Sequence, residues 1–113
     1  MIPDNFITSA NELPGYRIVR NVGIVRGIVV RSRSIVGTIG AGLQSLFGGN
    51  ITLWSELCEM TRRDAYQLMA QHAAAAGGNA VVAMRYDATE FMTGATEVLA
   101  YGTAVKLGAS RPE

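Results

Sequence analysis

Residues branched at Cβ dominate the segment from Tyr16 to Arg33, which follows a turn at Pro14-Gly15. Such residues favour extended backbone, so the pattern predicts a β-strand. Gly23 and Gly27 interrupt the run at positions where a strand would bulge or bend. The segment is therefore expected to form one long bent strand or two short ones.

Two stretches of helical periodicity follow this strand. Between Ser34 and Gly48, apolar residues recur every three or four positions, which predicts a short amphipathic helix capped by Ser34. From Leu53 to Ala76 there is no proline or glycine, and the apolar residues gather in one half of the helical wheel. This second, long helix is expected to lie along a sheet, with Glu59 and Arg63 paired on its wet face.

Two more strands are predicted after Gly77-Gly78, which ends the long helix. The segment Asn79 to Tyr86 is nearly all apolar, as is typical of a strand in the middle of a sheet. Asp87 to Gly94 is predicted to be a turn, and Ala95 to Leu107 alternates as a returning strand. The order of elements predicts a two-layer α+β fold with a mainly antiparallel sheet, one long helix and one shorter helix.

The length of 113 residues suits a single domain over 1–113, with a flexible N-terminal arm over 1–15 and a frayed tail over 108–113. Only 17% of the residues are charged, against roughly 25% in a typical soluble domain. Because 49% are hydrophobic, the chain has little charged surface for its size. We therefore expect it to hide surface by associating with copies of itself.

Charge and cysteine usage limit the partners and the compartment. A net charge of +1 provides no strong field, which argues against nucleic acid as a partner. Residues 1–13 contain no basic residue and lack the pattern of a secretory signal. The single Cys58 cannot form an intrachain disulfide, so a reducing cytoplasmic location is expected.

The uncharged stretch from Ser34 to Ser55 is long enough to span a bilayer, but it contains five glycines together with Gln44 and Asn50. It is predicted to be a surface helix. Five arginines precede it between Arg17 and Arg33, so association with an anionic membrane surface is an alternative, although these cations do not line the helix itself.

Three residues on or near the apolar arc of the long helix have side chains that bind metals: Cys58, Asp64 and His72. A thiol with an imidazole favours a soft or borderline divalent ion such as zinc or copper. Cys58 and His72 lie ~21 Å apart on a straight helix, so one chain cannot use both on one ion. Symmetry-related copies could bring such residues together at a subunit interface.

Each of these residues also has a structural interpretation. Cys58 suits a small buried apolar site, and His72 suits a partly buried position near the end of the helix, where its charge would favour the dipole. Asp64 is expected either to pair with an arginine of the strand region or to face a neighbouring subunit, because an unpaired buried charge is costly.

Other groups of residues provide weaker evidence of a functional site. Asp87, Glu90 and Glu97 could bind a hard cation, but a solvated turn is the simpler interpretation. The glycines at 37, 40 and 42 lack the lysine of a phosphate-binding loop. The arginines could bind an anion, or pair with Glu56, Glu59 or Asp64. One histidine and no nucleophile motif predict a protein that is not an enzyme.

Several segments together resemble the YbjQ family, small bacterial proteins described as heavy-metal-binding domains. They are the Gly48-Gly49 break, Glu56-Leu57 and Ala65 in the long helix, GGNAVVAMRYD (Gly77 to Asp87) and AYGTAVKL (Ala100 to Leu107). The resemblance covers Tyr16 to Leu107. It implies a dodecin-like subunit that assembles into a ring-shaped homopentamer, with short extra strands joining neighbours.

The leading hypothesis is a homo-oligomer, expected to be pentameric, that binds a heavy metal or small ligand at subunit interfaces. Cys58, Asp64 and His72 are its candidate ligands, and a divalent transition metal is the expected cofactor. A structural or protein-interaction module without metal is the main alternative. An enzyme with a pocket between subunits ranks last, because the sequence has no convergent nucleophile and base.

Overall fold

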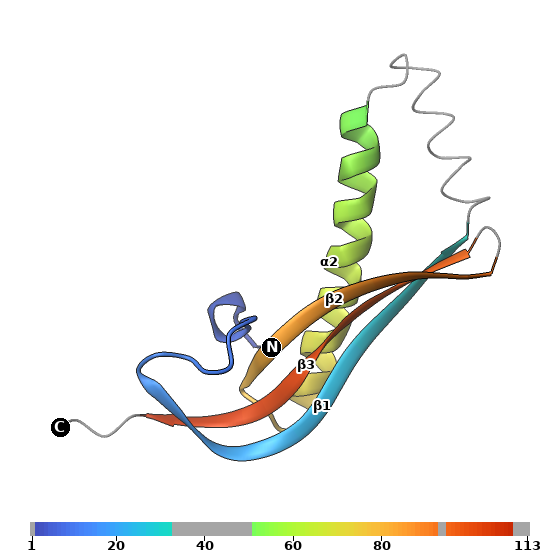
Figure 1. Ribbon diagram of the computed structural model, residues 1–113. Helices are drawn as coiled ribbons and strands as arrows, with labels where there is room; N and C mark the ends of the chain where they lie inside the picture. The colour runs from blue at the N-terminus through green and yellow to red at the C-terminus, as the bar shows by residue number, and fades with distance from the viewer. Residues whose placement is uncertain (1, 33–50, 93–94, 110–113) are drawn as a thin grey trace.

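The computed structural model describes residues 2–32, 51–92 and 95–109, and for residues 51–57 it describes the backbone alone. The described elements are η1 (Asp4–Phe6), β1 (Tyr16–Ser32), α2 (Ile51–Ala75), β2 (Ala80–Met92) and β3 (Ala95–Ala109). The strands form one antiparallel sheet in the order β1-β3-β2, and α2 crosses one face of it (Figure 1). The predicted α+β class and the long helix are confirmed. The predicted shorter helix lies outside the described residues.

Strand β1 is the long bent strand that the sequence predicts. Its pairing with β3 shifts register between Ile18 and Arg20 and again between Asn21 and Gly23. Gly23 has a φ of +135°, which side chains rarely adopt, so glycine is required at the second irregularity. The bend divides β1 into one half that runs past the helix and one that lies beneath it (Figure 1).

Gly27 does not bulge, contrary to its predicted role. It pairs in register with Ala100, and α2 packs directly on it. A Cβ atom at this position would collide with the Ala65 carbonyl oxygen and would lie 2.5 Å from Met69 N and 2.8 Å from Leu68 Cβ. The glycine therefore allows the close approach of helix to sheet.

The turn predicted over 87–94 is wrong for most of its length, because β2 continues to Met92. Asp87 pairs with Leu99 and Glu90 with Thr96. This half of β2 is exposed along its length, so backbone pairing with β3 holds it extended while its side chains can be polar. In a sequence, such a run of polar residues is typical of a turn. Here the residues are polar because this half of the strand is exposed to solvent.

Strand β2 also lies at an edge of the three-stranded sheet and not in its middle, which β3 occupies. Its apolar first half is explained by the N-terminal segment, which covers its outer side. Thr8 N donates to the Val81 carbonyl at 2.9 Å, and Met84 N donates to the Thr8 carbonyl at 3.0 Å. A central-strand composition can thus occur at an edge that another segment covers.

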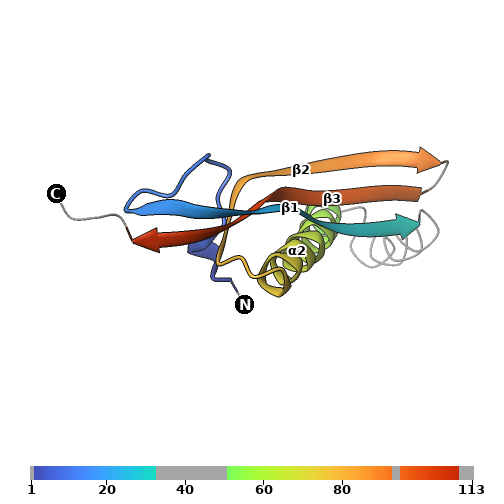
Figure 2. The same ribbon diagram turned by 90° about the horizontal axis from the view of Figure 1, so that it is seen from below.

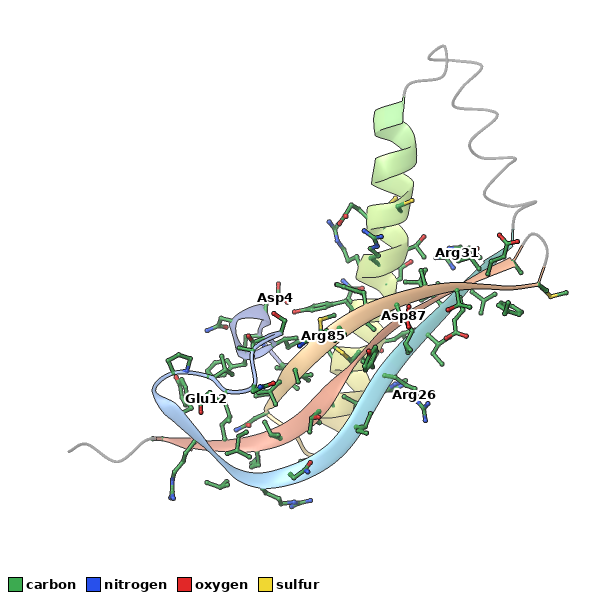
Figure 3. The ribbon with its side chains drawn as sticks, in the orientation of Figure 1. Asp4, Glu12, Arg26, Arg31, Arg85 and Asp87 are labelled. Carbon is green, nitrogen blue, oxygen red and sulfur yellow. The ribbon has the colours of Figure 1, made fainter. Side chains whose placement is uncertain are left out.

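The N-terminal segment, for which the sequence predicts a flexible arm over residues 1–15, lies on the sheet in the structure. Ile2 is buried in the main core, and the rings of Phe6 and Tyr16 meet edge to face with centroids 5.2 Å apart. Arg85 Nη1 donates to the Ser9 carbonyl at 2.8 Å, and Figure 3 shows this arginine beside the segment. Apolar anchors and backbone pairing together hold the arm on the sheet.

The first two residues of the predicted frayed tail over 108–113 fall within β3. Gly108 and Ala109 belong to β3, where they pair with Arg17 and Tyr16. The extra length arises because β1 begins at Tyr16 and so offers pairing partners as far as Ala109. Residues 110–113 lie outside the described part of the chain.

The buried face of α2 follows the predicted period, with Ala65, Met69 and Ala73 fully buried. Ala70, which the helical wheel places on the wet side, is also buried, and it lies beside Ile2. Met60 is 57% exposed although the wheel places it on the apolar side. The early turns of α2 extend away from the sheet, so they have no sheet beneath them (Figure 1).

In the view from below, α2 lies on one side of the sheet (Figure 2). The other side, here called the open face, carries apolar residues that alternate along β1 with buried ones. Ile24 is 80% exposed there, and Ile28 and Val30 are also exposed. The described chain has a radius of gyration of 17.5 Å and extents of 61 × 26 × 20 Å, whereas a compact domain of this length would have a radius of about 13 Å.

Candidate functional site

The three predicted metal ligands all lie on α2, and the structure does not bring them together. Cys58 is exposed and belongs to the early turns of α2, which leave the sheet (Figure 1). Its predicted burial as a small apolar residue is therefore wrong. Among the described residues there is no group of three or more His, Cys, Asp or Glu side chains that could hold a metal ion.

Asp64 forms an ion pair with β1. Its Oδ2 atom accepts a hydrogen bond from Arg31 Nη2 at 2.9 Å. This confirms the predicted pairing with an arginine of the strand region. On the exposed side of α2, by contrast, Glu59 Oε1 lies 3.8 Å from Arg62 Nη1, and among the described residues Glu59 makes no ion pair with the predicted partner Arg63.

His72 lies in the last turn of α2, next to the outer edge of β1. Its Nδ1 atom is 2.6 Å from the carbonyl oxygen of Arg26. Because a carbonyl can only accept, Nδ1 must carry the proton of this hydrogen bond. In the neutral imidazole, Nε2 is then the nitrogen with a free lone pair. Orientation by a backbone carbonyl is the usual arrangement behind a metal-binding histidine.

A groove of about 430 Å³ surrounds His72 at this edge. We call it the histidine groove; its other lining residues are Ile24, Val25, Arg26, Ile28 and Leu68. Its walls are mainly aliphatic, and the imidazole is its one group that can bind a metal. Figure 3 shows Arg26 projecting from the outer side of β1.

The acidic residues of the predicted turn do not converge either. They lie on paired strands, where Thr89 stands opposite Glu97 and so places Asp87 and Glu97 on one face. Glu90, an odd number of residues from Asp87, lies on the other face. Asp87 Oδ1 instead accepts a hydrogen bond from the backbone N–H of Ala88 at 3.0 Å.

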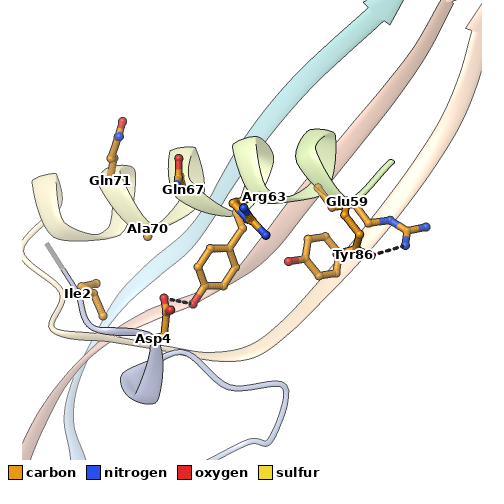
Figure 4. Close-up of a pocket in the computed structure, with 10 residues that line it drawn as sticks. Ile2, Asp4, Glu59, Arg63, Gln67, Ala70, Gln71 and Tyr86 are labelled. Carbon is orange, nitrogen blue, oxygen red and sulfur yellow. Dashed lines mark hydrogen bonds and ion pairs between the residues drawn. The ribbon is translucent and has the colours of Figure 1, made fainter. Parts of the chain in front are cut away.

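A second groove, of about 600 Å³, lies on the other flank of α2, between the helix, β2 and the N-terminal segment (Figure 4). We call it the tyrosine groove. Its lining residues are Ile2, Asp4, Glu59, Arg62, Arg63, Tyr66, Gln67, Ala70, Gln71 and Tyr86. The sequence does not predict this groove, because the groove forms only where the N-terminal segment packs beside α2 and β2.

The two tyrosines of this groove have perturbed acidity. Burial, together with a hydrogen bond that Tyr66 Oη donates to Asp4 Oδ1 at 2.9 Å, raises the pKa of Tyr66 to about 12. Burial and the nearby negative charge of Glu59 raise the pKa of Tyr86, against the opposing effect of Arg62. Both phenols are neutral hydrogen-bonding groups at ordinary pH.

Fold and grooves together define a class of small α+β domain, in which one helix crosses one face of a three-stranded antiparallel sheet and is flanked by two open grooves. The chain belongs to the YbjQ family, whose model is described as "Putative heavy-metal-binding" and matches residues 6–108. The resemblance seen in the sequence is therefore confirmed.

Curated relatives share most of this sequence. A UPF0145 protein of Solibacter usitatus is 66% identical over 107 residues, covering 95% of this chain and 96% of the relative. A UPF0145 protein of Chromobacterium violaceum is 64% identical, covering 95% and 92%. These names assign no activity.

A solved structure supports the fold. A protein of unknown function from Pediococcus pentosaceus, of the DUF74 family, superposes with a TM-score of 0.59 at 16% identity, covering 91% of this chain and 97% of that one. At this identity the likeness concerns the fold alone. Separately, no helix in the described ranges is long and apolar enough to cross a membrane.

Proposed function

We propose that this protein is a cytoplasmic homo-oligomer, a pentameric ring without enzymatic activity, that binds a divalent transition metal ion at its subunit interfaces. The observation that carries the metal assignment is the hydrogen bond from His72 Nδ1 to the Arg26 carbonyl. It fixes the imidazole and leaves Nε2 available at an exposed edge of the subunit.

The surface of the subunit supports self-association. Within the described ranges, no strand pairs with the outer edge of β1, and beyond Met84 none pairs with the outer edge of β2. Free edges attract further strands, so one subunit's β1 can meet the next subunit's β2. Such a head-to-tail contact closes into a ring when its rotation allows. The exposed Ile24, Ile28 and Val30 provide apolar area for these contacts.

The spacing of the candidate ligands supports a shared site. Cys58, Asp64 and His72 lie on one helix, too far apart for a single ion, and Asp64 is already held by Arg31. A metal ion would therefore take His72 from one subunit and further ligands from another. Thiolate and imidazole ligands suit zinc, copper or nickel better than hard cations.

Native mass spectrometry of untagged protein, purified without chelators or nickel resin, tests both halves of the proposal. We expect a pentamer that gains integral metal masses on addition of zinc, copper or nickel. His72→Ala and Cys58→Ala should reduce the uptake, whereas the control Gln71→Ala, on an exposed neighbouring position, should not. A pentamer that takes up none of these metals would exclude the metal site, and a monomer would exclude the assembly.

The second candidate is a protein-interaction module that binds no metal. It is favoured by the exposed Phe91 and Met92 at the end of β2, whereas His72 belongs to the last turn of α2. Large apolar side chains on a projecting hairpin are typical of a contact surface. In this case substitutions of Phe91 and Met92 would abolish function in cells, while Cys58→Ala and His72→Ala would leave it intact.

A further inference from the structure

We propose that the tyrosine groove binds a small aromatic anion of the nucleoside monophosphate class, with the base against Tyr66 and Tyr86 and the phosphate on Arg63. The groove lies between α2, β2 and the N-terminal segment, on the opposite flank of α2 from His72. The proposal is therefore independent of the metal site.

The size and floor of the groove suit a small organic ligand. Its volume of about 600 Å³ falls within the range of known ligand sites, roughly 300–1,000 Å³. Ile2 and Ala70 are both buried among the lining residues and give it an apolar floor. Ligand sites in proteins usually combine such a floor with a few polar groups that fix orientation.

Two aromatic rings from different elements line the groove. Tyr66 projects from α2, where its hydroxyl is fixed on Asp4, and Tyr86 projects from β2. Tyr86 is exposed, so its ring is available for contact (Figure 4). Stacking of bases on aromatic side chains is a main source of affinity in complexes of proteins with single-stranded nucleic acids.

The groove contains two carboxylates, Asp4 and Glu59, and two guanidinium groups, Arg62 and Arg63. Asp4 accepts the hydrogen bond from Tyr66, and Glu59 lies 3.8 Å from Arg62. Arg63 makes no ion pair with any residue that the structure describes, and in Figure 4 it projects from α2 into the region between Asp4 and Tyr86. A guanidinium in this position can bind a phosphate through two parallel hydrogen bonds.

Two amides complete the lining. Gln67 and Gln71 are one helical turn apart on the exposed side of α2 and share a face. A carboxamide offers both donors and an acceptor, which matches the edge of a nucleobase. Aromatic rings, amides and an arginine at one site favour a nucleotide over a simple inorganic anion, which would use the arginine alone.

Isothermal titration calorimetry with adenosine monophosphate tests the proposal, and adenosine serves as the uncharged comparison. We expect saturable binding of the nucleotide and at least tenfold weaker binding of adenosine, since a hydrogen bond to a charged group is typically worth about that factor or more. Arg63→Gln and Tyr86→Ala should each weaken nucleotide binding about tenfold, whereas Tyr86→Phe, which keeps the ring, should retain it.

Arg17→Gln, at the far end of β1, is the matched control for loss of one positive charge and should leave binding unchanged. Circular dichroism verifies that each variant is folded. The proposal fails if adenosine monophosphate does not bind at millimolar concentration, if adenosine binds equally well, or if Arg63→Gln has no more effect than Arg17→Gln. Binding of a single-stranded RNA but not of the mononucleotide would also overturn it.

Discussion

Asp64 and Arg31, 33 residues apart in the chain, are joined by a 2.9 Å ion pair that ties the middle of α2 to the end of β1. Along the chain, Asp64 follows the early turns of α2, which extend away from the sheet (Figure 1). The ion pair therefore links β1 to α2 next to the turns, with Cys58, that leave the fold.

Removing this ion pair should have a small effect on stability. The two side chains retain 37% and 51% of their exposure, and exposed pairs contribute about 0.2–1 kcal/mol. We expect a double-mutant cycle of Arg31→Gln and Asp64→Asn, measured by urea unfolding, to give a coupling energy in this range. The coupling should weaken at high salt, and a value of zero would show that the pair does not form in solution.

Substitution of Gly27 by alanine should be far more disruptive. The added Cβ meets backbone atoms of α2 that cannot move aside, so the helix must lift from the sheet. We expect a loss of about 3 kcal/mol in the free energy of unfolding, the upper part of the range for overpacking. The matched control is Gly108→Ala, whose Cβ would lie 3.0 Å from Cγ1 of the exposed Val19, a side chain that can rotate away. Equal losses in the two variants would contradict this account.

Ile2→Ala tests whether the N-terminal segment is held on the sheet. We expect a loss of about 2 kcal/mol, as for other large-to-small changes in a core, and faster hydrogen exchange at the amides of Ala83 and Met84. These two amides donate to carbonyls of the segment, those of Ala10 and Thr8. Amides of β3 should be unaffected, and Asn5→Ala, at an exposed position, provides the control. Fast exchange at Ala83 and Met84 already in the unsubstituted protein would instead support the flexible arm that the sequence predicts.

The raised pKa of Tyr66 predicts a loss of stability at high pH. Its folded-state pKa of about 12 exceeds the ordinary value of 10.0, so the unfolded chain loses this proton first as pH rises. The stabilising contribution is complete below about pH 10 and disappears as pH rises towards 12. Tyr66→Phe should remove the most basic step from the ultraviolet titration of the tyrosinates and reduce the fall in stability. An unchanged titration would contradict the hydrogen bond to Asp4.

Periodicity and residue type were sufficient for the elements themselves. The uninterrupted helical pattern located α2, and the β-branched run located β1 with its irregularity at Gly23. These features could be predicted because they depend on near neighbours along the chain: φ preferences, side-chain crowding and the spacing of apolar residues. The pairing of Asp64 with an arginine followed from the cost of an unpaired charge.

The position of β2, the length of its hairpin and the docking of residues 2–10 could not be predicted in this way. Each depends on which surface happens to be covered by a distant segment. The apolar residues of β2 are buried by α2 and β3 together with Ile2, Phe6 and Leu13 of the N-terminal segment, although the same composition would suit a central strand. Likewise, nothing in the sequence around Gly27 indicates that α2, whose contacting residues begin 38 positions later, packs against it.

The candidate sites also combine features that the sequence determines with features that arise only in the folded chain. The sequence alone determined which side chains could bind a metal, because a thiol, a carboxylate and an imidazole are ligands wherever they lie. Only the tertiary structure decided that Asp64 is held by Arg31 and that His72 is oriented by the Arg26 carbonyl. It also created the tyrosine groove, whose lining residues come from three separate segments. The physical reason is that local propensity acts between neighbours in the chain, whereas burial, charge pairing and cavities arise between surfaces that meet only on folding.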